Sequence, residues 1–495
     1  MKSIKQLSII ATAITIAACG SSNTDKTTEV NDIDQGYQGI WVSEDKGLAV
    51  EVGTDHVINY QFTSDYCFKV DELDNVNTND INRVVNLTDD GTLDWFAGYG
   101  PQSIRASSFE LVKMSNLPLS CQTNVVALQG QAGHTRNPEQ TFAIFSQIFE
   151  EYYMDFELQN VDWLGLAQAQ AAAINADSSV LDLLIAMDNM IQPLADAHTS
   201  VSTPDGISVS YNNKLVLAER LVKEFAEINA IPFPIPAQII TESQLQQLQD
   251  YVEQGLATQQ AIIANYALNE DEIKVRADGA VYWFENEGLG YLHIGKMLGF
   301  HEDNDEADAL QNDTDEIAAI DAILDEALSD LANVGGLIVD VRTNNGGHEF
   351  VSLAIASRFT DSRVLAYTKK HGKTSPTQEI FIEPRGEHTF TGPIALLVSS
   401  TTVSAAETFA MSMSVLDNVT VIGETTQGAF SDIMDWTLPN GFDVALSSEF
   451  YYDADGNWLE GEGVPVDIEV PFFSHQEREQ EYDAGIEAAS SLFDQ

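Results

Sequence analysis

A serine at the junction of a strand and a helix is the first residue in this chain that could do chemistry. Residues 397–407 (LVSSTTVSAAE) pass from apolar strand formers through a short polar turn into small, helix-compatible residues. A Ser404 hydroxyl at such a turn is exposed, and backbone N–H groups of the first helical turn point toward it. The pattern suits a nucleophile with nearby donors for an oxyanion, although a plain helix N-cap serine has the same pattern.

A second segment could supply another oxyanion donor. Residues 340–347 (DVRTNNGG) join a buried strand to the paired glycines Gly346 and Gly347. Glycine lets the backbone approach a ligand closely and turn its N–H inward. Taken alone, the segment is more simply explained as a tight turn, and it lacks the spacing of nucleotide-binding loops.

A histidine and a carboxylate could complete such a site. His198, in residues 194–201 (LADAHTSV), lies where a helix ends and a strand begins. A neutral imidazole with a pKa of about 6.5 can accept a hydroxyl proton and return it, and His348 is the nearest alternative base. Residues 455–467 (DGNWLEGEGVPVD) indicate a hairpin and a tight loop, where a carboxylate could orient the base or serve only as turn and surface charge.

The elements around these residues divide the chain into regions. Residues 35–130 contain short alternating runs and turn signals, which predict a small all-β domain. Residues 136–275 have apolar residues at helical spacing and predict a helical subdomain with an insert. Residues 280–475 alternate strands with helices, which predicts an α/β core with a largely parallel sheet. Residues 476–495 are expected to form a C-terminal helix.

The N-terminus has the features of an export signal. Lys2 and Lys5 precede a short apolar run that ends in small residues before Cys19, a sequence similar to a bacterial lipobox. That resemblance implies lipidation of Cys19, removal of residues 1–18 and, because Gly20 follows, the outer membrane. A plain secretory signal is the alternative. Residues 20–34 are expected to be a flexible tether.

Cysteine usage and charge limit the partners. Export would place Cys67 and Cys121 in an oxidising compartment, so we expect one disulfide between them. Two cysteines cannot close a zinc site, and we expect neither a metal nor a cofactor. Lys and Arg total 23 against 77 Asp and Glu, a formal charge of −54. Such a surface repels phosphate backbones and anionic membranes, so we expect no nucleic-acid partner and membrane contact only through the anchor.

The order and spacing of these motifs resemble the tail-specific (C-terminal processing) serine peptidase family. The branch containing tricorn protease and the interphotoreceptor retinoid-binding protein is the more similar one. The resemblance covers residues 136–475 and includes L-x-D-x-H-T, D-x-R-x-N-x-G-G, T-x-S-A-A-E, G-E-x-T-x-G and E-G-E-G-V. It implies a ClpP/crotonase-like α/β peptidase core.

The resemblance also implies roles for individual residues. Ser404 would be the nucleophile and His198 the general base. The oxyanion donors would be Ala405 and either Gly346 or Gly347. Glu460 matches the acidic residue of the tricorn-type relay.

Two positions depart from the family pattern. Ala429 stands where the processing peptidases have a lysine, which argues against a Ser–Lys dyad and for the histidine. Ala197 stands where the tricorn relay has a serine. Glu460 must then reach His198 directly or through water, or Asp196 orients the base instead.

These features predict a secreted, lipid-anchored serine endopeptidase that acts on proteins or peptides in the bacterial cell envelope. A non-catalytic binding or carrier lipoprotein on the same scaffold is the main alternative, since fold does not fix function. A structural envelope lipoprotein is a third. The retention of Ser404, His198 and the glycine loop favours the enzyme. Residues 202–280 have no PDZ signature, and the oligomeric state is left open.

Overall fold

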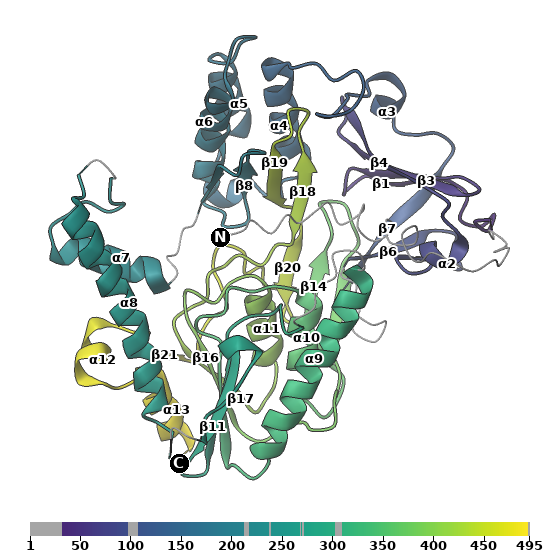
Figure 1. Ribbon diagram of the computed structural model, residues 1–495. Helices are drawn as coiled ribbons and strands as arrows, with labels where there is room; N and C mark the ends of the chain where they lie inside the picture. The colour runs from purple at the N-terminus through teal and green to yellow at the C-terminus, as the bar shows by residue number, and fades with distance from the viewer. Residues whose placement is uncertain are drawn as a thin grey trace, which may run out of the picture.

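The computed structural model describes residues 32–97, 107–211, 217–236, 239–267, 269, 272–301 and 309–493. Within these ranges the strands form four sheets (Figure 1). The predicted export signal and Cys19 lie outside the described residues. No described helix is both long and apolar enough to span a membrane.

The N-terminal part is an antiparallel seven-stranded sheet with the order β4-β3-β2-β1-β7-β6-β5. Its elements are β1 (Gly39–Ser43), β2 (Leu48–Val52), β3 (His56–Phe62), β4 (Cys67–Asp74), α2 (Thr78–Ile81), β5 (Val85–Leu87), β6 (Leu93–Ala97), β7 (Ser107–Met114) and α3 (Leu119–Thr123). Successive side chains point to opposite faces, so Leu48 and Val50 pack into one cluster while Ala49 packs into another. An antiparallel-sheet domain is therefore seen where the sequence predicts a small all-β domain, and it includes the short helices α2 and α3.

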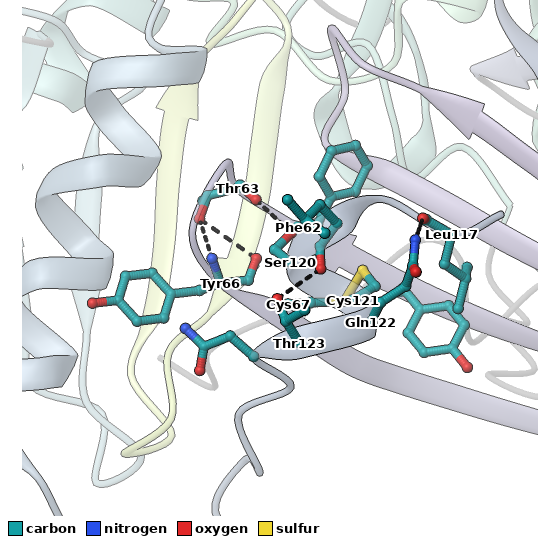
Figure 2. The surroundings of a disulfide bond; sticks show 12 residues. Phe62, Thr63, Tyr66, Cys67, Leu117, Ser120, Cys121, Gln122 and Thr123 are labelled. Atoms are coloured by element: carbon teal, nitrogen blue, oxygen red, sulfur yellow. Dashed lines mark hydrogen bonds between the residues drawn. A yellow bond between two sulfur atoms is a disulfide. The ribbon is translucent and has the colours of Figure 1, made fainter.

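A disulfide joins Cys67 at the start of β4 to Cys121 in α3 (Figure 2). The Ser120 hydroxyl, next to this bond, donates to the carbonyl oxygen of Thr63 over 2.8 Å. The short helix is therefore fastened to the β3–β4 turn by a covalent link and a hydrogen bond.

An aromatic helical layer follows the sheet. Its elements are α4 (Pro138–Tyr152), η3 (Glu157–Gln159), α5 (Trp163–Ala171), α6 (Val180–Ile191) and η4 (Gln192–Leu194). Helix α4 begins as the sequence predicts, with Pro138 in its first turn and the Asn137 side chain accepting the N–H of Gln140. Phe145 and Phe149 on its buried face stack around Trp163.

This layer packs against a four-stranded sheet that combines distant segments. The order is β18-β19-β8-β9, with β8 (Ser200–Ser202), β9 (Ser208–Ser210), β18 (Ile433–Thr437) and β19 (Asp443–Ser447). Strand β8 begins two residues after His198 and pairs antiparallel with β19. The pairing attaches the histidine segment to the C-terminal half of the chain.

The α/β core is built on a seven-stranded sheet with the order β10-β11-β12-β13-β16-β17-β21. The strands are β10 (Lys274–Arg276), β11 (Val281–Asn286), β12 (Leu289–Ile294), β13 (Gly336–Asp340), β16 (Ile394–Val398), β17 (Val419–Gly423) and β21 (Ile468–Glu469), and η6 (Ala277–Gly279) precedes β11. Strands β12, β13, β16, β17 and β21 run parallel to one another. Strand β11 pairs antiparallel with both β10 and β12. The largely parallel sheet is as predicted, with an antiparallel edge.

Helices cover both faces of this sheet (Figure 1). Helices α9 (Ala309–Asp330), α10 (Glu349–Ala356) and α11 (Ala405–Ser414) lie on one face, and α8 (Glu242–Ala264) and α13 (Ala484–Phe493) on the other. Val339 of β13 faces the first layer and Ile338 the second. Burial on both faces explains why these strands are continuous apolar runs.

The remaining elements sit around the core. They are α7 (Leu217–Ile228), α12 (His475–Gln480) and a three-stranded sheet of β15 (Gln378–Ile382), β14 (Val364–Lys370) and β20 (Phe450–Asp453). The single helix expected over residues 476–495 is wrong: two helices, α12 and α13, occupy this region. Glu481 ends α12 with a φ of 53°, and the Asp483 carboxylate accepts the N–H of Ile486 to start α13.

Candidate active site

The turn between β16 and α11 is held by its own hydroxyl groups. Ser399 Oγ donates to the carbonyl oxygen of Arg342 over 2.6 Å, and Thr402 Oγ1 donates to that of Val341 over 2.9 Å. Thr401 Oγ1 also donates to Arg342. The polar run after β16 therefore fastens the serine turn to the loop that follows β13.

Ser404 begins α11 with an unusual backbone. Its φ is 61° and its ψ is −127°. An ordinary N-cap residue has an extended backbone, and a left-handed conformation costs a non-glycine residue about 1–3 kcal/mol. Strained strand-to-helix turns present the nucleophilic serines of α/β-hydrolases. The backbone therefore separates Ser404 from the plain N-cap interpretation.

Buried charges shape the neighbouring loop after β13. The Arg342 guanidinium bonds the Asp340 carboxylate and also donates to Asp483 over 2.8 Å, and all three side chains are buried. Burial alone would raise the pKa of Asp340, but Arg342 lowers it to about 2. Tyr291 also donates to this carboxylate over 2.6 Å. Asp340 and Arg342, the D-x-R part of the motif, thus fix the start of the loop that contains Gly346 and Gly347.

Asn344 connects the loop after β13 to the end of β12 and to the serine turn after β16. Its side-chain amide donates to the Ile294 carbonyl over 3.0 Å, and its Oδ1 accepts the Gly346 N–H over 2.9 Å. Its backbone carbonyl accepts the N–H of Val403 over 3.2 Å. A Cβ on Gly346 would lie 2.7 Å from the Cβ of Ser404, so only glycine fits against the serine turn.

The hydrogen bonds distinguish the two glycines as oxyanion donors. Because the Gly346 N–H is given to Asn344, it is not available to a ligand. Gly347 is exposed with a φ of 144°, and its N–H has no partner among the described residues. The Ala405 N–H, at the start of α11, likewise lacks a partner within the described ranges. These two donors border the Ser404 turn.

A buried carboxylate from α11 joins the serine turn to a third loop. Glu407 Oε2 accepts the N–H groups of Ser404 and Ala429 over 3.2 and 2.8 Å. Its Oε1 accepts the Gly428 N–H and the Thr426 hydroxyl, each over 2.6 Å. Burial raises the pKa of Glu407, although these four donors oppose the rise. The loop after β17 is thereby held against Ser404.

Sequence reasoning assigned no role to Glu407 or Asn344. Glu407 stands three residues after Ser404, the spacing of a capping box, and this was the available signal. Asn344 lies in the D-x-R-x-N-x-G-G motif, and its bond to the Gly346 N–H is a local turn contact, but its bonds to Ile294 and Val403 depend on tertiary structure and leave no local pattern.

Glu460 is a second buried carboxylate that binds the loop after β17. Its Oε2 accepts the N–H groups of Phe430 and Ser431 over 3.1 and 3.0 Å. Burial, followed by the nearby charges of Asp196 and Glu407, raises its pKa well above the usual range. An ionised Glu460 is therefore stabilised when a positive charge forms beside it.

His198 follows a turn that Asp196 braces. Asp196 Oδ1 accepts the His198 N–H over 2.8 Å, which makes Asp196 a turn-stabilising residue. Asp196 Oδ2 and His198 Nδ1 are both buried and have no hydrogen-bond partner among the residues that the structure describes. The inward nitrogen of the imidazole is thus one that a further group could orient.

A small cavity separates the histidine loop from Glu460. Its volume is about 10 Å³, close to what one water molecule requires. It is lined by Tyr153, Met154, Leu158, Gln159, Leu194, Ala195, Asp196, Ala197, Gly428, Ala429, Glu460 and Gly461. The cavity places the segment before His198 beside the loop whose Ala429 carbonyl accepts the Ser404 N–H over 3.1 Å.

The alternative base, His348, is held differently. It precedes α10, its ring stacks on Phe350 at 5.0 Å, and its N–H donates to the Met297 carbonyl. Burial lowers its pKa, opposed by the charges of Glu316 and Asp432. These contacts give His348 a packing role.

The structure thus brings most of the predicted residues to one place. Ser404, Ala405, Gly346 and Gly347 meet where β13 and β16 end, and Glu460 joins them through the loop after β17. Among the described residues, no hydrogen bond joins His198 to Ser404 or to Glu460. The segment just before His198 lies near these residues because it lines the small cavity beside Glu460.

Comparisons with known proteins agree with this arrangement. Residues 288–470 match the sequence profile of peptidase family S41. The resemblance to the C-terminal processing peptidases is confirmed. A 157-residue stretch is 29% identical to the carboxy-terminal processing protease CtpA of Bacillus subtilis, covering 30% of this chain and 33% of that protein. The chain thus spans about a third of the length of this curated relative.

Solved structures support the fold. A putative peptidase from Parabacteroides merdae aligns over 72% of this chain and 97% of its own, with a TM-score of 0.53 and 20% identity. The tricorn protease aligns over 90% of this chain and 43% of its own, with 13% identity. Its TM-score of 0.41 is too low to support an inference. The S41 peptidase-like fold is therefore shown, whereas the tricorn-type branch stays a prediction.

Gly346→Ala should disable the serine turn. The added Cβ would meet Ser404 Cβ at 2.7 Å and the Val403 carbonyl oxygen at 2.8 Å. We expect the labelling rate of Ser404 by a fluorophosphonate probe to fall about 100-fold, the effect of misplacing a reacting group by about 1 Å. Gly456→Ala is the matched control, because Gly456 has the same φ of 87° with nothing within 4 Å. Equal labelling of both variants would contradict the close approach of the two loops.

Proposed function

We propose that this protein is an exported, lipid-anchored serine endopeptidase that hydrolyses peptide bonds through an acyl-enzyme. The observation that carries this proposal is the left-handed backbone of Ser404 beside the N–H groups of Ala405 and Gly347, which have no partner in the described part of the chain. Nucleophilic catalysis needs both a presented hydroxyl and donors for the oxyanion. A carrier protein needs neither, and its backbone strain would bring no benefit.

The proposed reaction follows from these positions. Ser404 Oγ attacks the peptide carbonyl while His198 accepts its proton, and the oxyanion is bound by the Ala405 and Gly347 N–H groups. His198 then gives the proton to the leaving amine as the C–N bond breaks. Water, deprotonated by His198, attacks the acyl group and restores the Ser404 hydroxyl.

Glu460 is proposed to orient His198. Ala197 leaves the cavity beside Glu460 where the tricorn-type relay has a hydroxyl, and one water can fill about 10 Å³. Such a water would join Glu460 to the histidine loop, whose Asp196 and Ala197 line the cavity. The buried Glu460 anion would be stabilised by the positive charge that forms on His198 in the transition state, and the anion would in turn stabilise that charge.

The core is further proposed to be ClpP/crotonase-like. The parallel β12-β13-β16-β17 sheet with helices on both faces supports this assignment. In such a sheet, ligands bind outside the carboxyl ends of the strands, and the loops after β13, β16 and β17 meet there. The predicted division into domains remains a proposal of the same kind.

Ser404→Ala and His198→Ala should each lower turnover of an unstructured protein substrate by at least about 1,000-fold, because a nucleophile and its base act as one unit. His348→Ala serves as the control and should keep most of the activity. Loss of activity only in His348→Ala would make His348 the base.

The orienting carboxylate can be identified by paired variants. Glu460→Gln should lower turnover clearly but by less than His198→Ala, because a group that only orients the base contributes less than the base. Asp196→Asn should have the smaller effect, since Asp196 Oδ1 is used by the turn. Turnover is compared at matched stability. If only Asp196→Asn loses activity, the base is held from its own loop and the tricorn-type relay is the wrong description.

Lipid anchoring is proposed from the sequence alone, with outer-membrane placement as its finer form. Wild-type protein should incorporate labelled palmitate and remain in the membrane fraction, because its mature N-terminus would be a diacylglyceryl Cys19. Cys19→Ser should abolish both. Labelled lipid in Cys19→Ser, or soluble wild-type protein with an unmodified N-terminus, would contradict the anchor.

A further inference from the structure

The tip of the β1–β2 hairpin leaves the N-terminal sheet and enters the peptidase core. Asp45, in this tip, accepts the Thr374 N–H and hydroxyl over 3.2 and 2.8 Å and the Ser375 hydroxyl over 2.5 Å. Gly47 allows the tight turn with a φ of 56°. The N-terminal sheet is therefore docked beside β14 rather than joined to it only by the chain (Figure 1).

Lys46, next to Asp45, pairs with a carboxylate deep in the core. Its Nζ bonds Glu449, whose side chain is 1% exposed. Glu449 also pairs with Lys369 at 2.8 Å and with His371 Nδ1 at 2.7 Å. Lys369 and His371 belong to the core, whereas Lys46 comes from the N-terminal sheet. Burial alone would raise the pKa of Glu449, but Lys369, Lys46 and His371 together hold it well below the usual range.

Glu449 is connected to the candidate active site by the backbone. Its N–H donates to Ser431 Oγ over 2.9 Å, and the Ser431 N–H donates to Glu460 over 3.0 Å. Two residues before Ser431, the Ala429 carbonyl accepts the N–H of Ser404. One short loop, residues 428–431, thus contacts the nucleophile, the proposed orienting carboxylate and the residue that Lys46 holds.

We infer that Lys46 is a positioning residue of the active site, through which the N-terminal sheet holds the loop of residues 428–431. The inference rests on the proposed peptidase function. Removing one cation from a buried anion leaves that anion incompletely compensated, so Glu449 must shift toward water or its remaining partners. A shift of Glu449 moves Ser431, and with it Glu460 and the support of Ser404. Docking by Asp45 is separate from this path and would persist.

The test compares Lys46→Met with Lys46→Arg and Lys69→Met. Lys69 is the matched control because its ion pair with Glu72 lies within the same N-terminal sheet and its side chain is 37% exposed. We expect Lys46→Met to lower kcat on an unstructured protein about tenfold while KM changes by less than about twofold. Lys46→Arg should recover most of kcat, and Lys69→Met should match the wild type. A purely structural defect would lower the melting temperature and the active fraction without this split.

Hydrogen exchange gives a second readout that needs no activity. Amides of residues 428–431 should exchange faster in Lys46→Met than in Lys69→Met. Unchanged exchange together with more than half of the wild-type kcat would overturn the role of Lys46. A wild-type protein with no Ser404-dependent turnover, but faster loop exchange in Lys46→Met, would overturn the peptidase proposal and leave the connection through Lys46 supported.

Discussion

The buried carboxylate of Glu407 is the interaction on which the candidate site depends. Its two oxygens accept hydrogen bonds from the serine turn and from the loop after β17, four donors in all. A carboxylate removed from water must have its acceptor capacity satisfied, and these donors do so. Because both oxygens are used, the two loops have one relative placement. The strained Ser404 backbone is maintained by bonds on both sides of it.

The other loops at this edge of the sheet are held by the same kind of interaction. Arg342 fixes the loop after β13 through Asp340, and Asn344 closes that loop onto the serine turn. Apolar packing is non-directional, so it cannot specify where an individual N–H points. Buried hydrogen bonds can specify this direction, and within the described residues they leave the N–H groups of Gly347 and Ala405 without a partner.

Local sequence patterns were sufficient for part of this structure. The continuous apolar runs predicted the parallel strands, and the two cysteines left after Cys19 allowed only one pairing. The motifs also placed Ser404 between a strand and a helix. Patterns could not choose between Gly346 and Gly347, because the choice depends on the side chain of Asn344. They could not break the C-terminal helix at Glu481 either, since the left-handed residue there is not a glycine.

The longest-range connection left no sequence signal at all. Lys46 and Glu449 are single charged residues in a chain with many, and nothing near either one indicates its partner. Their pairing is decided by how the hairpin tip docks, which is a property of two folded surfaces. Motif reasoning finds groups that touch substrate more readily than groups that hold them.

The pairing of Arg342 with Asp483 has a consequence for biosynthesis. During translation the ribosome completes the nucleophile, the histidine and Glu460 before it reaches Asp483. Until Asp483 has emerged, Arg342 lacks one of its two buried carboxylate partners. The loop after β13 is then held by fewer bonds than in the folded chain. On the proposed peptidase function, a chain whose C-terminal segment is still unmade would not yet hold the loop after β13 in its final position, so cleavage of substrates would begin only after the chain is complete.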